Sequence, residues 1–134
     1  MADNVLTNKG RFNMLHRWIT GTPTQASPTK FGIGTGTTDP ELTDTALQTP
    51  ITAWSGGANV KSFDSGYPTA TESTLETQFQ GTVNTTEANS NNISEVSIEN
   101  VDTTIKMMQR STFTAISKTS SDEIVWSAKI RITN

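Results

Sequence analysis

Cysteine is absent from this 134-residue chain. Its absence excludes a disulfide framework, a thiolate nucleophile and any cysteine-ligated metal. Histidine occurs once, as His16, so a Ser-His-Asp triad or a multi-histidine metal site would depend entirely on that residue. No apolar run approaches the length of a membrane span, and the opening residues MADNVLTNKG lack the apolar centre of a secretory signal. We therefore expect a soluble protein that is made in a cytosol and has no membrane partner.

Charged residues are few and unevenly placed. They make up 17% of the chain, and the formal net charge is −3. Basic residues are missing between Lys61 and Lys106, a stretch that contains Asp64, Glu72, Glu76, Glu87, Glu95, Glu99 and Asp102. This pattern predicts a solvated acidic surface or, alternatively, an acidic face that meets a basic partner or a neighbouring copy. The sequence pI of about 5.0, with no basic-aromatic stripe, argues against a nucleic-acid partner.

Threonine outnumbers every other residue type, which favours strands joined by many turns. The clearest strand is the last, where Ile124, Trp126, Ala128 and Ile130 alternate with polar or exposed positions. Further strands are predicted within residues 59–64, 73–83, 93–101 and 103–120, and the last of these is long enough to require a bulge.

One helix is predicted near the N-terminus. Phe12, Leu15, Trp18 and Ile19 share one face at helical spacing, and Gly21 ends the pattern. The expected fold is therefore mainly β: a single-domain antiparallel β-sandwich, jelly-roll-like, or an open barrel, with an N-terminal helix. Residues 1–22 would form the arm and helix, and residues 23–134 the sandwich, together making one compact domain.

The segment KFGIGTGTTDPELTDTALQTPI has three alternate glycines but does not fit a nucleotide site. A Walker loop needs Gly-Lys-Ser/Thr at a set distance, and a dinucleotide fingerprint needs glycine where this chain has Thr37. We expect instead a short strand containing Phe31 and Ile33, with glycines that allow close backbone approach. A second short helix is predicted to begin at Asp44 and to end at Pro50.

The remaining candidate sites are sparse. Asp39, Glu41 and Asp44 could bind Ca²⁺, but they lack the further ligands of an EF-hand, so helix capping is the preferred interpretation. The pairs Glu72/Glu76 and Glu95/Glu99 would suit glycosidase chemistry only across a cleft. Trp54 and Tyr67 are the candidates for stacking on a sugar, with Trp54 expected to be exposed beside SGGAN. We predict no catalytic, cofactor or metal site, and no enzyme activity.

The same segment supports a resemblance. FGIGTGTTDPELTDTALQTPI resembles a stretch in small structural proteins of tailed bacteriophages (decoration, tail or fibre-associated), in which Gly-Thr-Gly-Thr precedes an acidic turn and Asp-Thr-Ala-Leu. Two later segments, NISEVSIEN and MMQRSTFTAISKTSSDEIVWSAKIRI, are similar to the family's later strands. The matching residues are Ile93, Glu95, Val96, Arg110, Phe113, Ile116 and Lys118. Ser97 stands where the family has glycine, and the similarity runs from about Leu6 to Ile132.

The resemblance implies a non-enzymatic protein of the virion, made in the bacterial host cytoplasm. The expected role is a capsid decoration or cement protein that binds the major capsid protein as a homo-oligomer, with a trimer favoured. A tail, neck, baseplate or fibre-attachment role is the alternative, and a carbohydrate-binding module is the alternative of another class. The interface is expected on the helix, at Lys9, Arg11, Phe12, Leu15, Arg17 and Trp18. An equal alternative is that this helix merely covers one end of the sandwich.

Overall fold

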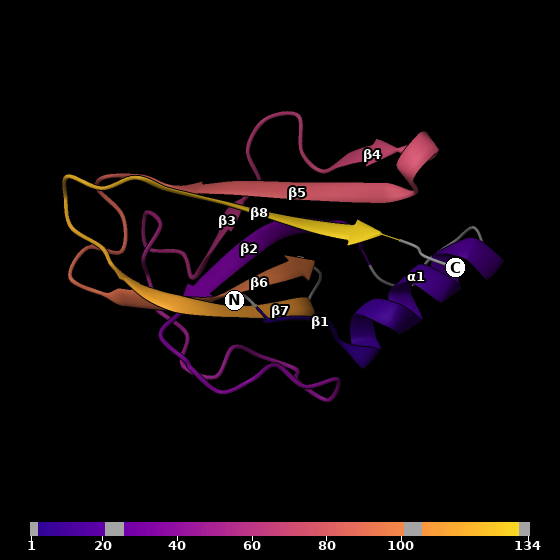
Figure 1. Ribbon diagram of the computed structural model, residues 1–134, viewed down its shortest axis with the longest axis horizontal. Coiled ribbons are helices and arrows are strands. Elements are labelled where there is room, and N and C mark those ends of the chain that lie inside the picture. Colours follow the sequence, from indigo (N-terminus) through magenta and orange to yellow (C-terminus); the bar gives the residue numbers. More distant parts are fainter. Residues whose placement is uncertain (1–2, 21–25, 101–105, 132–134) are drawn as a thin grey trace.

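The computed structural model describes residues 3–20, 26–100 and 106–131. It is mainly β, as predicted, and its two antiparallel sheets are arranged as in a β-sandwich. Figure 1 shows β5 and β8 above the strands of the larger sheet, with helix α1 (Asn8–Thr20) at one end.

The larger sheet has five strands in the order β1-β7-β6-β2-β3. Their bounds are β1 (Asp3–Leu6), β7 (Lys106–Ser117), β6 (Asn92–Asn100), β2 (Pro28–Gly34) and β3 (Val60–Ser62). Register shifts between β6 and β7 at Ile93/Glu95 and Ile98/Glu99 confirm the bulge that the length of the predicted strand required.

The smaller sheet has three strands in the order β4-β5-β8. These are β4 (Thr69–Thr71), β5 (Glu76–Val83) and β8 (Ile124–Arg131), and the 3-10 turn η1 (Glu72–Thr74) joins the first two. Along β8 partly buried residues alternate with exposed ones, which confirms the predicted alternation.

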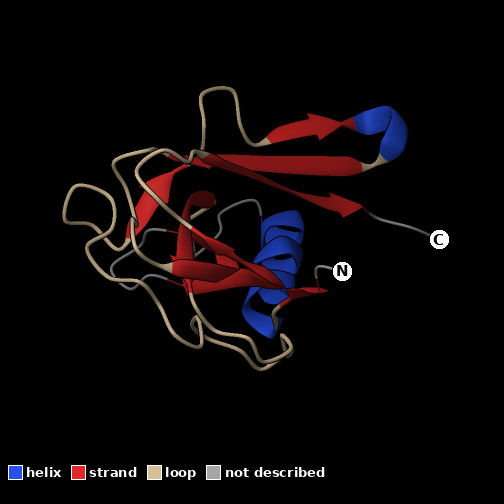
Figure 2. Cartoon of the chain, turned by 60° about the vertical axis from the view of Figure 1, so that its left-hand side comes forward, coloured by secondary structure: helices blue, strands red, loops and turns tan. Residues whose placement is uncertain are grey.

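The two sheets lie one above the other (Figure 2). The core cluster includes five aromatic side chains, those of Phe31, Trp54, Phe63, Phe113 and Trp126. The Phe31 side chain is fully buried, and its ring lies edge-on to Trp126 at 5.2 Å between centroids. A Cβ added at Gly81 would lie 2.5 Å from the Phe31 ring and 2.6 Å from the Trp126 indole nitrogen. Because real Cβ contacts do not come this close, glycine at position 81 is a packing requirement.

Three sequence expectations need correction. Residues 41–50 contain turns and no helix, because their backbone amides donate elsewhere. Leu75, within the strand predicted for residues 73–83, instead precedes β5 with a φ of 49° and is 54% exposed. The N-terminal arm was expected outside the sandwich, whereas β1 pairs with β7 from Asp3 to Leu6 and so belongs to the larger sheet.

Candidate functional site

The face of the larger sheet that points away from the core is covered by the segment from Thr35 to Thr49. The glycines of β2 make this cover possible. A Cβ at Gly34 would lie 2.3 Å from the Glu95 Oε1 atom and 2.6 Å from the Thr49 carbonyl oxygen. Phe31 and Ile33, the alternate residues of β2, lie in the core instead. The predicted role of the glycines, close backbone approach, is therefore confirmed.

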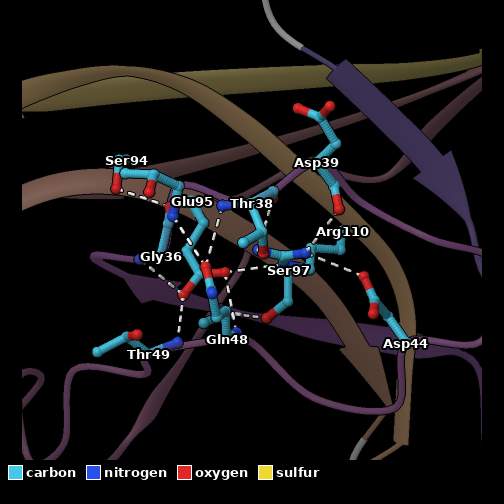
Figure 3. A network of polar contacts seen from close by, with 12 residues as sticks. Gly36, Thr38, Asp39, Asp44, Gln48, Thr49, Ser94, Glu95, Ser97 and Arg110 are labelled. Atoms are coloured by element: carbon cyan, nitrogen blue, oxygen red, sulfur yellow. Dashed lines mark hydrogen bonds and ion pairs between the residues drawn. The ribbon is translucent and has the colours of Figure 1, made fainter.

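Glu95 holds this segment in place. Its side chain is fully buried, and each carboxylate oxygen accepts two hydrogen bonds (Figure 3). The backbone amides of Gly36 and Thr49 donate to Oε1 at 3.1 and 2.8 Å. The amide of Gln48 and the Nε of Arg110 donate to Oε2 at 3.0 and 2.8 Å. Amides that would have hydrogen-bonded along the predicted helix thus bind a carboxylate from β6 instead.

Arg110 extends the network to the acidic turn. Its Nη1 donates to Asp44 Oδ2 at 3.0 Å, and its Nη2 donates to the Thr38 carbonyl oxygen at 3.1 Å. Burial acts to lower the pKa of the guanidinium, but the hydrogen bonds with Glu95 and Asp44 outweigh it and raise the pKa above its ordinary value. Asp44 also accepts from the Glu41 amide at 2.9 Å, so it caps a turn rather than a helix.

We call Glu95, Arg110 and Asp44 the polar clamp. Both oxygens of Glu95 are engaged by donors of the chain itself, so Glu95 has no open position for a substrate or an ion. The polar clamp therefore serves to hold the segment from Thr35 to Thr49 against the larger sheet. Sequence reasoning considered these three residues separately and did not predict that they meet. The signal that could have indicated it was a glutamate and an arginine inside strands that are otherwise apolar.

A groove opens beside the clamped segment, against the start of α1. Its volume is about 490 Å³, and it is lined by Asn8, Lys9, Phe12, Leu42, Thr43, Asp44 and Thr45. The Asn8 amide donates to the Leu42 carbonyl oxygen at 2.9 Å, which ties the helix to the segment. The groove residues Phe12 and Leu42 are 52% and 42% exposed, and Leu15 of α1 is 55% exposed.

Four of the six predicted interface residues, Lys9, Arg11, Phe12 and Leu15, have exposed side chains on α1. Two of them, Lys9 and Phe12, also line the groove. The side chains of Arg17, Trp18 and His16 lie outside the described residues.

The sugar-stacking pair is not assembled. Trp54 was expected to be exposed, but it is 5% exposed, packs on Phe31 at 5.5 Å and donates from Nε1 to the Asn59 carbonyl oxygen at 2.6 Å. Tyr67 is partly exposed in the turn that follows Asp64. The expectation for Trp54 is wrong because its indole fills the core, where apolar area is removed from water.

Part of the expected acidic surface is buried or ion-paired, whereas Glu72 is exposed. Glu95 and Glu99 are buried, and Glu87 pairs with Lys61 at 2.7 Å. Glu76 pairs with Lys129 and Arg131 at 3.0 and 2.9 Å. Within residues 3–20, 26–100 and 106–131 no cluster of acidic or histidine side chains could hold a metal ion, Asp39, Glu41 and Asp44 included.

Lys118, one of the residues on which the resemblance rests, is 1% exposed. Its Nζ donates to the Asn89 side-chain oxygen at 2.9 Å and to the Thr119 carbonyl oxygen at 2.7 Å. These bonds fasten the loop after β5 to the end of β7.

Comparisons with family models, with curated proteins and with solved structures found no match. Within the described part of the chain, no helix is long and apolar enough to cross a membrane.

Proposed function

We propose that this chain is a non-enzymatic structural protein of a tailed-bacteriophage virion, acting as a decoration protein that binds the head shell and stabilises it. The observation that carries the proposal is the pair of exposed apolar side chains Phe12 and Leu42, which line a groove whose far wall is held by the polar clamp. Leu15, three residues after Phe12 on α1, is also exposed. A protein that works through contacts needs such a preformed surface, because ordering it on binding would cost affinity.

The sequence resemblance supports the same role. The resemblance rests on three separate stretches, which contain the glycine-threonine segment, Glu95 and Arg110. In the folded chain these three are joined by hydrogen bonds within the polar clamp. The jelly-roll-like form that we propose for the sandwich is an architecture used by capsid domains. The neighbouring Lys9 and Arg11 would face an acidic surface of the major capsid protein.

Stabilisation of the shell would follow from mass action. A protein that binds only the assembled, expanded lattice lowers the free energy of that state and of no other. No cofactor and no catalytic step enter this role.

The first experiment is immunogold labelling of intact particles that contain this chain, viewed by electron microscopy. Dense label over heads, matching roughly hundreds of copies per particle, supports decoration. Label restricted to the tail, neck, baseplate or fibre attachment points would keep the virion role and discard the shell role. Particles without label would contradict the proposal as a whole.

A second experiment tests the surface. Phe12→Gln combined with Leu15→Gln should weaken binding to expanded shells that lack this protein, by about tenfold or more, since apolar anchors dominate interface energetics. Leu75→Gln is the matched control, because Leu75 is similarly exposed at 54% but lies just before β5 and not on α1. Equal binding by both variants would exclude α1 as the anchor.

A further inference from the structure

The edge of β8 is open. In the smaller sheet β8 follows β5, and among the described residues it has a hydrogen-bonded neighbour on that side only. A strand edge presents backbone N–H and C=O groups that an added strand can satisfy. The inner residues of β8 are also incompletely covered: Ile124, Trp126, Ala128 and Ile130 are each only partly buried. A hollow of about 330 Å³ lies beside them, reaching Phe113 and Ile116 of β7.

The outer face of β8 has an unbalanced charge. Lys129 and Arg131 share a single carboxylate, that of Glu76 on β5. Their hydrogen bonds hold the pKa of Glu76 below its ordinary value. At the other end of the strand the exposed Glu123 precedes Ile124 and forms no ion pair with any of the described residues. The two ends of the edge therefore carry opposite charge.

We infer that the β8 edge pairs antiparallel with the β8 edge of a second copy, about a two-fold axis at Ser127. In this register Glu123 of each copy lies opposite Arg131 of the other, and Val125 lies opposite Lys129. On the inner face Ile124 meets Ile130, and Trp126 meets Ala128. Inner-face residues lie opposite inner-face residues, and outer-face residues lie opposite outer-face residues. The two copies therefore form one six-stranded sheet whose apolar face continues across the axis.

The partner is a second copy because the strand is complementary to itself. Pairing about Ser127 supplies the missing carboxylate beside Arg131 at both ends of the edge, so that two cations and two carboxylates meet at each. It also keeps each Lys129 away from its symmetry mate and lays its aliphatic stem beside the exposed Val125. The pairing does not depend on the proposed virion role, and it replaces the expected trimer by a two-fold pair.

The absence of cysteine makes a clean test possible. Ser127→Cys places one thiol at the axis, where paired Cα atoms lie about 4.5–5.5 Å apart, within the range of a disulfide. Val125→Cys is the matched control, since its two copies would lie about 14 Å apart along the strands. Under mild oxidation the first variant should give a covalent dimer and the second should not. Equal cross-linking of both variants, or of neither, would overturn the register.

The native chain gives the complementary measurement. Sedimentation velocity should show a concentration-dependent species of twice 14.5 kDa. Glu123→Arg should weaken this association about tenfold, because it places like charges opposite each other twice in each dimer. Glu72→Arg makes the same charge change in the turn between β4 and β5, outside the paired strand, and should leave the association unaltered. A monomer at every concentration, or a species of three times the chain mass, would refute the pairing.

Discussion

At the scale of single residues, the polar clamp is the most demanding feature of the chain. Glu95 and Arg110 are 0% and 2% exposed, so each charge depends on the other for the solvation that water no longer provides. Breaking such a pair from one side is costly because it leaves an uncompensated buried charge. Three backbone amides also lose their acceptor if the carboxylate is removed.

Glu95→Gln should therefore lower the free energy of unfolding by about 3–5 kcal/mol, measured by urea denaturation. The NH₂ group of the new glutamine side chain would face backbone N–H groups, and two donors cannot form a hydrogen bond. The charge of Arg110 would also lose its compensating carboxylate. Glu123→Gln, at an exposed position, should change stability by less than about 0.5 kcal/mol.

Arg110→Met tests the same pair from its other side. Combining it with Glu95→Gln should cost less than the sum of the two single losses, because both changes break one interaction. Full additivity would show that the residues do not act as a pair.

Glu99 offers a prediction about pH. Burial raises the pKa of its carboxyl group above the ordinary value of 4.5, although the hydrogen bond from the Ser97 hydroxyl acts to lower it. Its neighbours in register are Lys30 on β2 and Met107 on β7. The folded state holds this proton more tightly than the unfolded state, so the free energy of unfolding falls as pH rises from about 4.5 through the raised pKa.

Glu99→Gln should remove that decline. The free energy of unfolding, measured from acid to neutral pH, should rise in the variant relative to the native chain as pH increases. The difference between the two should be largest at neutral pH. Two curves that stay parallel would show that Glu99 does not titrate in this way.

At the scale of elements, the segment from Thr35 to Thr49 has no regular structure of its own. Its position depends on groups of the larger sheet that contact it: glycines on β2, a carboxylate on β6 and a guanidinium on β7. Loops usually expose their backbone groups to water, and this one directs several of them inward. The bonds from Arg110 to Asp44 and from the Asn8 amide to the Leu42 carbonyl oxygen keep these residues beside the start of α1.

Gly34→Ala should detach part of this segment. The added methyl group would meet Glu95 Oε1 and the Thr49 carbonyl oxygen, so the segment must shift and the variant should lose about 1–3 kcal/mol. Thermal unfolding followed by circular dichroism measures the loss. Thr29→Ala, at an exposed position on the same strand, is the control and should leave the melting temperature nearly unchanged.

At the scale of the whole molecule, the two proposed surfaces lie on different elements. The groove involves α1 and the clamped segment, whereas the pairing edge is β8, so one copy could use both at once. A protein with two independent interfaces can link its neighbours as well as bind a lattice.

Dimerisation at β8 also predicts that stability depends on concentration. The melting temperature of the native chain should rise with protein concentration, because the paired state binds folded chains only. Glu123→Arg should flatten this dependence, and added salt should weaken it by screening the Glu123–Arg131 contacts. A melting temperature independent of concentration in the native chain would contradict the pairing.

The sequence by itself determined the elements that depend on local periodicity. Alternation from Ile124 to Ile130 predicted β8 and its inner face, and the spacing of Phe31 and Ile33 between glycines predicted β2 with a close neighbour. These patterns are readable because a strand places successive side chains on opposite faces regardless of its partners. The mainly-β class follows from them.

Only the tertiary structure decided where the polar side chains of the middle region go. Asp44 resembled a helix cap, but Glu95, far away in the sequence, takes the amides that the helix would have used. Trp54 sits in a glycine-rich stretch typical of surfaces, but the core between the sheets encloses it. Such long-range hydrogen bonds and burial depend on which strands become neighbours, and periodicity along one strand contains no information about that choice.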